Sequence, residues 1–238
     1  MTYKDVYAII PARSGSKGLP DKNIKLLDGL PLIAYSINFA KKLGCERVIC
    51  STDSEEYARI ARECGAEVPF LRSDFAAADT AMEQDILNDL AVKFKDNNIP
   101  FPKIIVWLRP TFVFRDLDSI KECIDVLLKK EEYTAARTVC ESESRLYKLD
   151  EGNLAPVFDD KGKSMIRRQD VGVSYKVFST DVIRFDPNKI SDDFLGRKVY
   201  GVVINKMCGL DIDDSEDFQI VESIIKYNKD LVDNYLFK

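Results

Sequence analysis

Three cations gather in the loop at residues 11–23, which directly follows a short apolar run. The loop reads PARSGSKGLPDKN and carries Arg13, Lys17 and Lys22 beside two glycines. Glycines let a backbone turn and approach a ligand closely, and turn backbone can direct N–H groups at an anion. At the carboxyl end of a first strand, this composition predicts a polyphosphate site. The alternative is a basic surface loop without a ligand.

The loop matches neither of the two common phosphate-binding motifs. A Walker A loop requires GxxxxGK followed by Ser or Thr, whereas Gly18 is followed by Leu19 and Pro20. A dinucleotide fingerprint requires GxGxxG, whereas the run from Gly15 reads GSKG. The residues therefore indicate a triphosphate or a similar anion and argue against an ordinary ATPase or dehydrogenase.

A second cluster, LDIDDSED at residues 210–217, is rich in carboxylates. In an extended segment Asp211 and Asp213 point to the same side, because the strand period is two. Paired carboxylates favour a nearby cation, and Mg²⁺ prefers a few hard oxygen ligands together with phosphates and water. The alternative is structural, because Asp213 with Glu216 forms a capping box for a final helix. The metal site and the helix cap are compatible if Asp211 binds the metal and Asp213 takes part in both.

Three arginines are further candidates for ligand contact. Arg72 lies either near the nucleotide or at the surface beside Asp74. Arg109 ends an apolar run and has the bidentate donor fork that suits a carboxylate, although Pro110 by itself would end a strand and leave Arg109 solvated. Arg168 belongs to a basic doublet that is either a solvated turn or part of an arm that reaches a neighbour's site.

Composition excludes several classes of function. The 35 Lys and Arg against 40 Asp and Glu give a net charge of −5, which argues against nucleic-acid binding. The chain has no histidine, so mechanisms that need an imidazole base are excluded. Its apolar runs are too short for a membrane span, and its six cysteines form no CxxC pair. We expect reduced cysteines in a cytoplasmic protein.

Apolar runs and helical patterns alternate over the first two thirds of the chain. Expected strands lie at residues 6–10, 47–51, 68–71, 103–108, 135–139 and 198–205, and expected helices at 32–43, 55–64, 81–95, 117–130 and 215–228. The strands lack alternation, as is typical of strands buried on both faces of a parallel sheet. This order predicts a doubly wound, mostly parallel α/β sheet.

The pattern breaks at residues 141–185, which are polar and rich in turns. Short apolar pieces at residues 154–158 and 177–185 indicate ribbon strands. We interpret the segment as an excursion from the main sheet that serves as an oligomerisation arm.

Four motifs, in this order, resemble those of the CMP-nonulosonate synthetases, which are the acylneuraminate and legionaminate cytidylyltransferases and their pseudaminate relatives. They are PARSGSKGLPDKNI, STDSEEYARIARECGAEVPFLR, LRPTFVFRD and LDIDDSEDF. CMP-Kdo synthetases are more distant cousins. The resemblance implies a Rossmann-like nucleotide-binding domain at residues 1–140 plus 186–238, with a β-rich dimerisation arm inserted at 141–185.

The resemblance implies an enzyme that transfers CMP from CTP to the anomeric hydroxyl of a nonulosonic acid, a keto-acid sugar, and releases pyrophosphate. It implies a homodimer and Mg²⁺ as the cofactor, bound by Asp211 and Asp213. Catalysis would rest on Lys22, Arg13 and Asp211, with Lys22 stabilising charge on the α-phosphate. The implied nucleotide-binding residues are Arg13, Ser16, Lys17, Lys22, Asn23 and Arg72, and the implied sugar-binding residues are Arg109, Thr111, Lys148 and Arg168.

The chain departs from the family pattern at three places. Arg109 replaces a glutamine, as in legionaminate-type relatives. Met82 and Glu83 stand where the family has a serine pair near the cytosine pocket, and residues 175–181 replace an RPNGAIY-like ending of the arm. These positions bear on the selection of the sugar and the base.

Two other functions remain open. A nucleotidyltransferase acting on Kdo or on a sugar 1-phosphate shares the fold, but the GxGTRL-type loop of the sugar-phosphate enzymes is missing. A non-catalytic nucleotide-binding homologue would account for the altered arm, whereas the presence of Lys22, Asp211 and Asp213 argues for catalysis.

Overall fold

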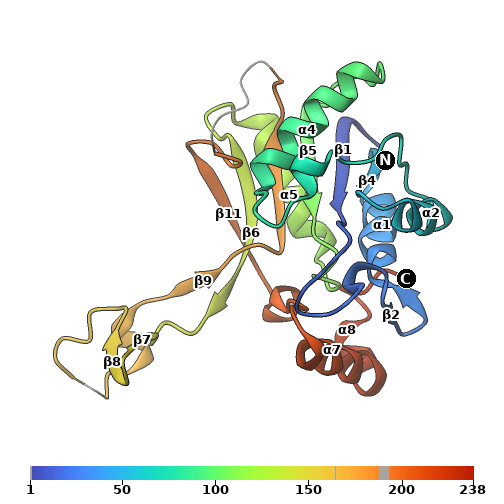
Figure 1. Cartoon of the computed structure of the whole chain (residues 1–238). Coiled ribbons are helices and arrows are strands. Elements are labelled where there is room, and N and C mark those ends of the chain that lie inside the picture. The colour runs from blue at the N-terminus through green and yellow to red at the C-terminus, as the bar shows by residue number, and fades with distance from the viewer. Residues whose placement is uncertain (1, 164, 188–192) are drawn as a thin grey trace.

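The computed structural model describes residues 2–163, 165–187 and 193–238. A seven-stranded sheet forms the centre of the molecule, and a ribbon projects away from it (Figure 1). The strand order is β11 (Val199–Ile204), β6 (Ala135–Ser142), β10 (Thr180–Arg184), β5 (Ile104–Leu108), β1 (Tyr3–Pro11) and β4 (Cys45–Ser51), and β9 (Ser174–Lys176) pairs with β6.

The sheet is mostly parallel, as the sequence predicts. Strand β1 pairs in parallel with both β4 and β5, and β11 pairs in parallel with β6. Strand β10 runs antiparallel between β5 and β6. The carboxyl ends of β4, β1 and β5 therefore meet at one edge of the sheet, where the loops that follow them form a crevice.

Helices cover both faces of the sheet, which confirms the doubly wound α/β architecture. Alternate residues of β1 separate the two layers, because neighbouring side chains in a strand point to opposite faces. Ala8 packs with residues of α1 (Leu32–Leu43), α2 (Glu55–Glu63) and α5 (Leu117–Lys129). Ile9 packs instead with the apolar side of α4 (Glu83–Asp96).

Short elements and a C-terminal helical pair complete the body. They are η1 (Lys22–Ile24), β2 (Leu26–Leu27), β3 (Leu30–Pro31), α3 (Asp74–Ala77), η2 (Lys206–Gly209), α7 (Ser215–Tyr227) and α8 (Lys229–Val232). Apolar residues of α7 pack against the start of α1 in a core cluster of their own. Within the described ranges, no helix is both long enough and apolar enough to cross a bilayer.

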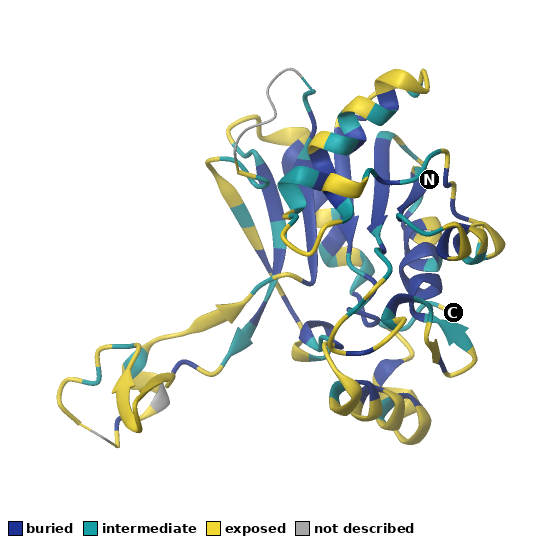
Figure 2. Ribbon diagram, viewed as in Figure 1, coloured by how far each residue is buried: buried dark blue, intermediate teal, exposed yellow. Residues whose placement is uncertain are grey.

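The projecting ribbon, which we call the arm, carries β7 (Tyr147–Asp150), β8 (Asn153–Pro156) and α6 (Arg168–Val171). Strands β7 and β8 pair with each other and are exposed along their whole length (Figure 2). Several of their side chains are nevertheless apolar, including Leu149 and Leu154 at 71% and 68% exposure. A lone two-stranded hairpin is marginally stable in water, so the arm presents an apolar surface that its own chain leaves uncovered.

Two expectations for secondary structure are wrong. Residues 68–71 are not a strand, and the isolated bridge between Glu67 and Ile49 lies just before them. Residues 177–185 are not part of the ribbon, because β10 lies in the middle of the main sheet with Val182 and Ile183 fully buried. A short apolar run does not report which strands flank it. The segment outside the main sheet is therefore shorter than residues 141–185.

Candidate active site

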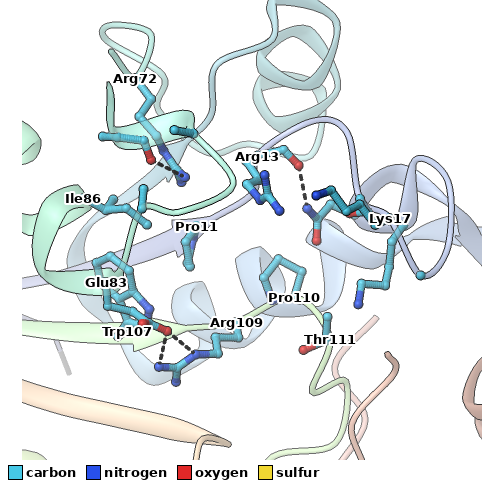
Figure 3. A pocket seen from close by; sticks show the side chains of 17 residues that line it. Pro11, Arg13, Lys17, Arg72, Glu83, Ile86, Trp107, Arg109, Pro110 and Thr111 are labelled. Atoms are coloured by element: carbon cyan, nitrogen blue, oxygen red, sulfur yellow. Dashed lines mark hydrogen bonds and ion pairs between the residues drawn. The ribbon is translucent and has the colours of Figure 1, made fainter. Parts of the chain in front are cut away.

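A cleft of about 320 Å³ opens at the carboxyl edge of the sheet. Arg13 and Lys17 lie on one side of it, and Glu83, Ile86 and Trp107 lie on the other (Figure 3). The cleft thus has a cationic side at the loop after β1 and an opposite side where apolar side chains stand next to the Arg109–Glu83 ion pair. Most of the site residues predicted from the sequence line it, namely Arg13, Ser16, Lys17, Lys22, Asn23, Arg72, Arg109 and Thr111.

Hydrogen bonds from neighbouring elements hold the loop after β1 in shape. Asp53, which follows β4, accepts hydrogen bonds from the Ser14 backbone N–H at 2.8 Å and from its hydroxyl at 2.7 Å. Burial works to raise the pKa of Asp53, but these two hydrogen bonds hold it below the usual range. The buried Asn23 donates from Nδ2 to the Arg13 carbonyl oxygen at 3.0 Å, so its first role is to shape the loop.

The three loop cations have different partners. Arg13 and Lys17 each contact a carboxylate oxygen of Asp79 at 2.6 Å. Lys17 is 76% exposed and Asp79 is 49% exposed, so this ion pair is a weak surface interaction. Lys22 is different, because its side chain is only 14% exposed and its Nζ lies 3.7 Å from Oδ1 of Asp213. Lys22 therefore joins the cationic loop to the acidic segment.

Arg72 is buried and forms part of the cleft lining. Its Nε and Nη2 donate to the hydroxyl and the carbonyl oxygen of Ser51, at 3.1 and 2.7 Å. Burial lowers the pKa of the guanidinium, although the carboxylate of Asp53 opposes this shift. The alternative of a surface pair with Asp74 is excluded by this burial, and Arg72 supports the floor of the cleft.

The capping box of α7 is formed by residues other than those expected. Asp214 is the N-cap, and its Oδ1 accepts from the backbone N–H groups of Glu216 at 2.8 Å and Asp217 at 3.0 Å. The expectation that Asp213 caps the helix with Glu216 is wrong by one residue, because Asp214 has the same chemistry and an acidic partner three residues on. The carboxylate of Asp213 is 76% exposed and free of the cap.

Asp211 stands in a more buried environment beside Thr111. The backbone N–H of Ile212 donates to the Thr111 carbonyl oxygen at 3.1 Å, which fixes the acidic segment against the loop after β5. Oδ1 of Asp211 is buried without a hydrogen-bond partner among the described residues. Burial raises the pKa of Asp211, and the nearby charge of Asp213 raises it further. Asp211 is thus a desolvated carboxylate with an unused oxygen.

Arg109 lies at the centre of an ion-pair network. It donates to Oε1 of Glu83 from Nε and Nη2, at 3.2 and 2.9 Å, and from Nη1 to Oδ2 of Asp181 at 2.8 Å. The fully buried Asp181 also accepts from Arg137 at 2.8 Å. Burial works to lower the pKa of Arg109, but Asp181 and Glu83 outweigh it and raise the pKa. The guanidinium is therefore charged and tightly held.

A family model described as cytidylyltransferase matches residues 7–189. The chain belongs to the cytidylyltransferase family. This match and the named relatives that follow together confirm the resemblance read from the four sequence motifs.

Several named cytidylyltransferases and synthases are similar to this chain. A CMP-N,N'-diacetyllegionaminic acid synthase of Legionella pneumophila is 41% identical over 51% of this chain and 52% of its own length. An N-acylneuraminate cytidylyltransferase of Escherichia coli is 30% identical over 97% of this chain and 54% of its own. The chain thus spans about half the length of these two relatives. A pseudaminic acid cytidylyltransferase of Campylobacter jejuni is 30% identical over 92% of this chain and 96% of its own.

A solved structure of a CMP:2-keto-3-deoxy-manno-octonic acid synthetase complexed with CTP has a similar fold. The TM-score is 0.68, with coverage of 94% of this chain and 99% of that one. At 13% identity, this likeness confirms the Rossmann-like fold.

Two predicted sugar-binding residues of this chain lie outside the cleft. Lys148 is exposed on β7, in the part of the arm that projects from the body (Figure 1). Arg168 begins α6, also in the arm, and its side chain lies outside the described residues. The cleft and the arm of one chain are therefore separate features.

Three acidic residues around the cleft were not predicted as site residues. Asp79 contacts two loop cations, Glu83 lines the cleft, and the buried Asp181 forms an ion pair with Arg109. The sequence carries a partial signal for Glu83, because it stands where the family has a serine. It carries none for the pairing of Asp181, which depends on the position of β10 in the sheet.

Proposed function

We propose that this protein transfers CMP from CTP to the anomeric hydroxyl of a nonulosonic acid. In this reaction the hydroxyl oxygen forms a bond to the α-phosphorus, the bond to the β-phosphate oxygen breaks, and pyrophosphate and a proton leave. The observation that carries the proposal is the contact of Lys22 with Asp213. Lys22 lines the cleft, so this contact joins the polyphosphate-binding loop to the acidic segment of Asp211 and Asp213, which lies beside the cleft lining. Family membership and the names of the relatives support the same reaction.

The cationic side of the cleft would bind the triphosphate. Arg13, Lys17 and the Ser16 hydroxyl line this side, and Gly18 exposes backbone beside them. Lys22 is the least exposed of the three loop cations and lies next to the acidic segment. We assign to Lys22 the stabilisation of charge that develops on the α-phosphate, since a fixed cation in a shielded position acts strongly on such charge.

Asp211 and Asp213 fit a divalent metal ion. The buried, unpartnered Oδ1 of Asp211 and the raised pKa of this group are both relieved by a cation. Within the described residues no group of three acidic or cysteine side chains gathers to hold a metal, so a metal ion at the two aspartates would need phosphate and water as further ligands, which Mg²⁺ accepts. When bound there, Mg²⁺ would neutralise phosphate charge and align the reacting groups.

The acceptor sugar would be bound by Thr111 in the cleft and by Lys148 and Arg168 of an arm. Arg109 is a weaker candidate for the sugar carboxylate than the sequence suggests, because four of its N–H donors already serve acceptors within the chain. Since the arm of each chain points away from the cleft of the same chain, we propose a homodimer in which each arm reaches the partner's cleft. The apolar side chains exposed on β7 and β8 support this assembly.

A pyrophosphate-release assay tests the reaction. CTP and Mg²⁺ are supplied with N-acetylneuraminate, legionaminate, pseudaminate or Kdo, and the CMP-sugar product is identified by its mass. We expect release with at least one of the three nonulosonic acids and a loss of about a hundredfold or more in Lys22→Ala. Lys25→Ala is the matched control, because Lys25 lies three residues on and outside the cleft lining. Activity with Kdo alone, or with none of the four sugars, would overturn the proposal.

The family also suggests where the protein works. We infer a cytoplasmic location, where CTP is available and thiols stay reduced. The six cysteines, all in the described part of the chain, are free, and five of them are buried.

A further inference from the structure

Among the described residues that line the cleft, Glu83 is the single carboxylate. Its position is unexpected, because a cleft that takes a nucleoside triphosphate binds a polyanion and a carboxylate there repels the phosphates. The side chain is one-third exposed, so it is accessible from the cleft and not merely buried beneath it. Such a group is retained at a cost in phosphate affinity, which calls for a specific role.

Glu83 lies on the side of the cleft that is away from the loop cations Arg13 and Lys17 (Figure 3). Ile86, Trp107 and the paired Arg109 lie near Glu83 in this view, and the cleft lining also contains Ala78 and Ala81. Ile86 follows Glu83 by three residues on α4, so both side chains lie on the same face of the helix. Apolar walls with a few placed polar groups are typical of small-molecule sites, and they suit the ring of a base. With the phosphates on the cationic side, the base of the nucleotide falls beside Glu83.

The contacts of Glu83 leave one oxygen available to a ligand. Oε1 accepts both hydrogen bonds from Arg109, whereas Oε2 accepts none from the residues that the structure describes. Arg109 has five N–H donors, and four of them serve Glu83, Asp181 and the Phe178 carbonyl oxygen. One N–H of Nη2 remains, next to the carboxylate. The pair therefore offers a hydrogen-bond acceptor and a donor side by side.

We propose that Glu83 selects the base of the nucleotide by accepting a hydrogen bond from the 4-amino group of cytosine, with Arg109 as its positioning residue. The inference rests on the proposed function, in which CTP is the nucleotide. Cytosine carries an amino donor at position 4, where uracil carries a carbonyl acceptor, and carboxylates accept from that amino group in other recognition sites. The acceptor–donor pair of Glu83 and Arg109 matches cytosine and opposes uracil.

The position of Arg109 is fixed from the middle of the sheet. Its Nη1 donates to Asp181 on β10, and the second oxygen of Asp181 accepts from Arg137 on β6. Asp181 is fully buried and is not part of the cleft lining. Arg109, which holds the carboxylate of Glu83, is thus itself held by Asp181 on β10, and Asp181 is held by Arg137 on β6. This chain of contacts keeps Glu83 rigid, as a residue that determines specificity needs to be.

The test compares the binding of CTP and UTP to the full-length protein by titration calorimetry in the presence of Mg²⁺. We expect the unmodified protein to prefer CTP, and Glu83→Gln to lower the ratio of the two affinities about tenfold or more, because one base hydrogen bond is lost and the amide can donate to uracil. Glu83→Ala should lower the ratio as well. Because removal of a negative charge strengthens phosphate binding to both nucleotides alike, the ratio is the decisive readout.

Two further variants separate base reading from other effects. Glu55→Gln makes the same chemical change at an exposed first-turn position of α2, outside the cleft, and should leave the ratio unchanged. Asp181→Asn removes the other carboxylate of Arg109 and should change the ratio less than Glu83→Gln does. An unchanged ratio in both Glu83 variants would overturn the inference. If the unmodified protein discriminates in favour of CTP through Glu83 but releases no pyrophosphate with any sugar, the inference stands and the proposed reaction falls.

Discussion

The α-carbon of Gly18 faces the main chain of Asp213 so closely that a β-carbon on residue 18 would lie 2.6 Å from the Asp213 carbonyl oxygen. Nζ of Lys22 lies 3.3 Å from the same oxygen and donates a hydrogen bond to it. The loop after β1 and the segment before α7 are therefore joined through one carbonyl group. Residue 18 is a glycine because of this close approach.

Replacement of Gly18 by alanine should separate the two segments. The added methyl group meets backbone that cannot rotate away, so we expect a loss of about 1–3 kcal/mol in the free energy of unfolding. We also expect pyrophosphate release to fall about tenfold or more, because Lys22 and Asp213 are displaced relative to each other. Gly29→Ala is the control, since its φ of 82° strains an alanine without any contact within 4 Å. A similar loss of activity in both variants would contradict this account.

Substitution of two adjacent aspartates should affect different properties, one the stability and the other the metal requirement of the activity. Asp214→Ala removes the cap of α7 and should lower the free energy of unfolding by about 1 kcal/mol. Asp213→Ala should leave stability within about 0.5 kcal/mol, because its exposed carboxylate is free of the cap, but it should raise the Mg²⁺ concentration needed for half-maximal activity. Urea denaturation and a Mg²⁺ titration of both variants measure these effects. Equal effects on the metal requirement would argue against a metal role for Asp213.

Asp211→Asn should stabilise the metal-free protein while it abolishes activity. The folded-state pKa of Asp211 is raised, chiefly by burial and further by Asp213. A group of this kind supports the folded state below its unfolded pKa, and that support is lost as the pH rises through the folded pKa. Near neutral pH the buried, ionised carboxylate therefore destabilises the folded state, and asparagine at this position removes that effect. We expect a higher melting temperature for the variant at about pH 7–8.

The melting temperatures of the two proteins should converge as the pH falls toward the usual pKa of aspartate, because Asp211 is then protonated in the parent as well. Thermal scans with a chelator, from about pH 4 to about pH 8, give this comparison. A constant difference across that range would show that the effect of the substitution is not electrostatic.

The helices of the core could be predicted closely because their signals are local. The apolar spacing at residues 32–43 predicts α1 with the bounds that the structure has, and Gly44, with a φ of 86°, ends it. The position of β10 could not be predicted, because an apolar run of five residues fits a ribbon, an edge or a sheet centre equally well. The cap of α7 was misplaced by one residue because Asp213 and Asp214 offer the same side chain.

The residues of the candidate site also differ in whether they could be predicted from the sequence. The cationic loop and the acidic segment are contiguous motifs, so their residues could be named from the sequence. The partners of Arg13 and Arg109 could not, because Asp79 and Asp181 lie 66 and 72 residues away along the chain. Nothing local marks which of the 40 acidic residues will meet a given arginine. Those pairings follow from the order and direction of the strands.

Phe178 should prefer replacement by glycine to replacement by alanine. Its φ is 83°, a conformation that costs a residue with a β-carbon about 1–2 kcal/mol. Its half-exposed ring lies 5.2 Å from the guanidinium carbons of both Arg109 and Arg137, and each contact contributes about 0.5–1 kcal/mol. Alanine loses the ring and keeps the strain, whereas glycine loses both. We therefore expect Phe178→Gly to be about 1 kcal/mol more stable than Phe178→Ala in urea denaturation, the reverse of the usual order of the two residues. If Phe178→Ala were the more stable variant, the positive φ at residue 178 would not be strained. The account of a strained backbone that holds the ring over the two arginines would then be wrong.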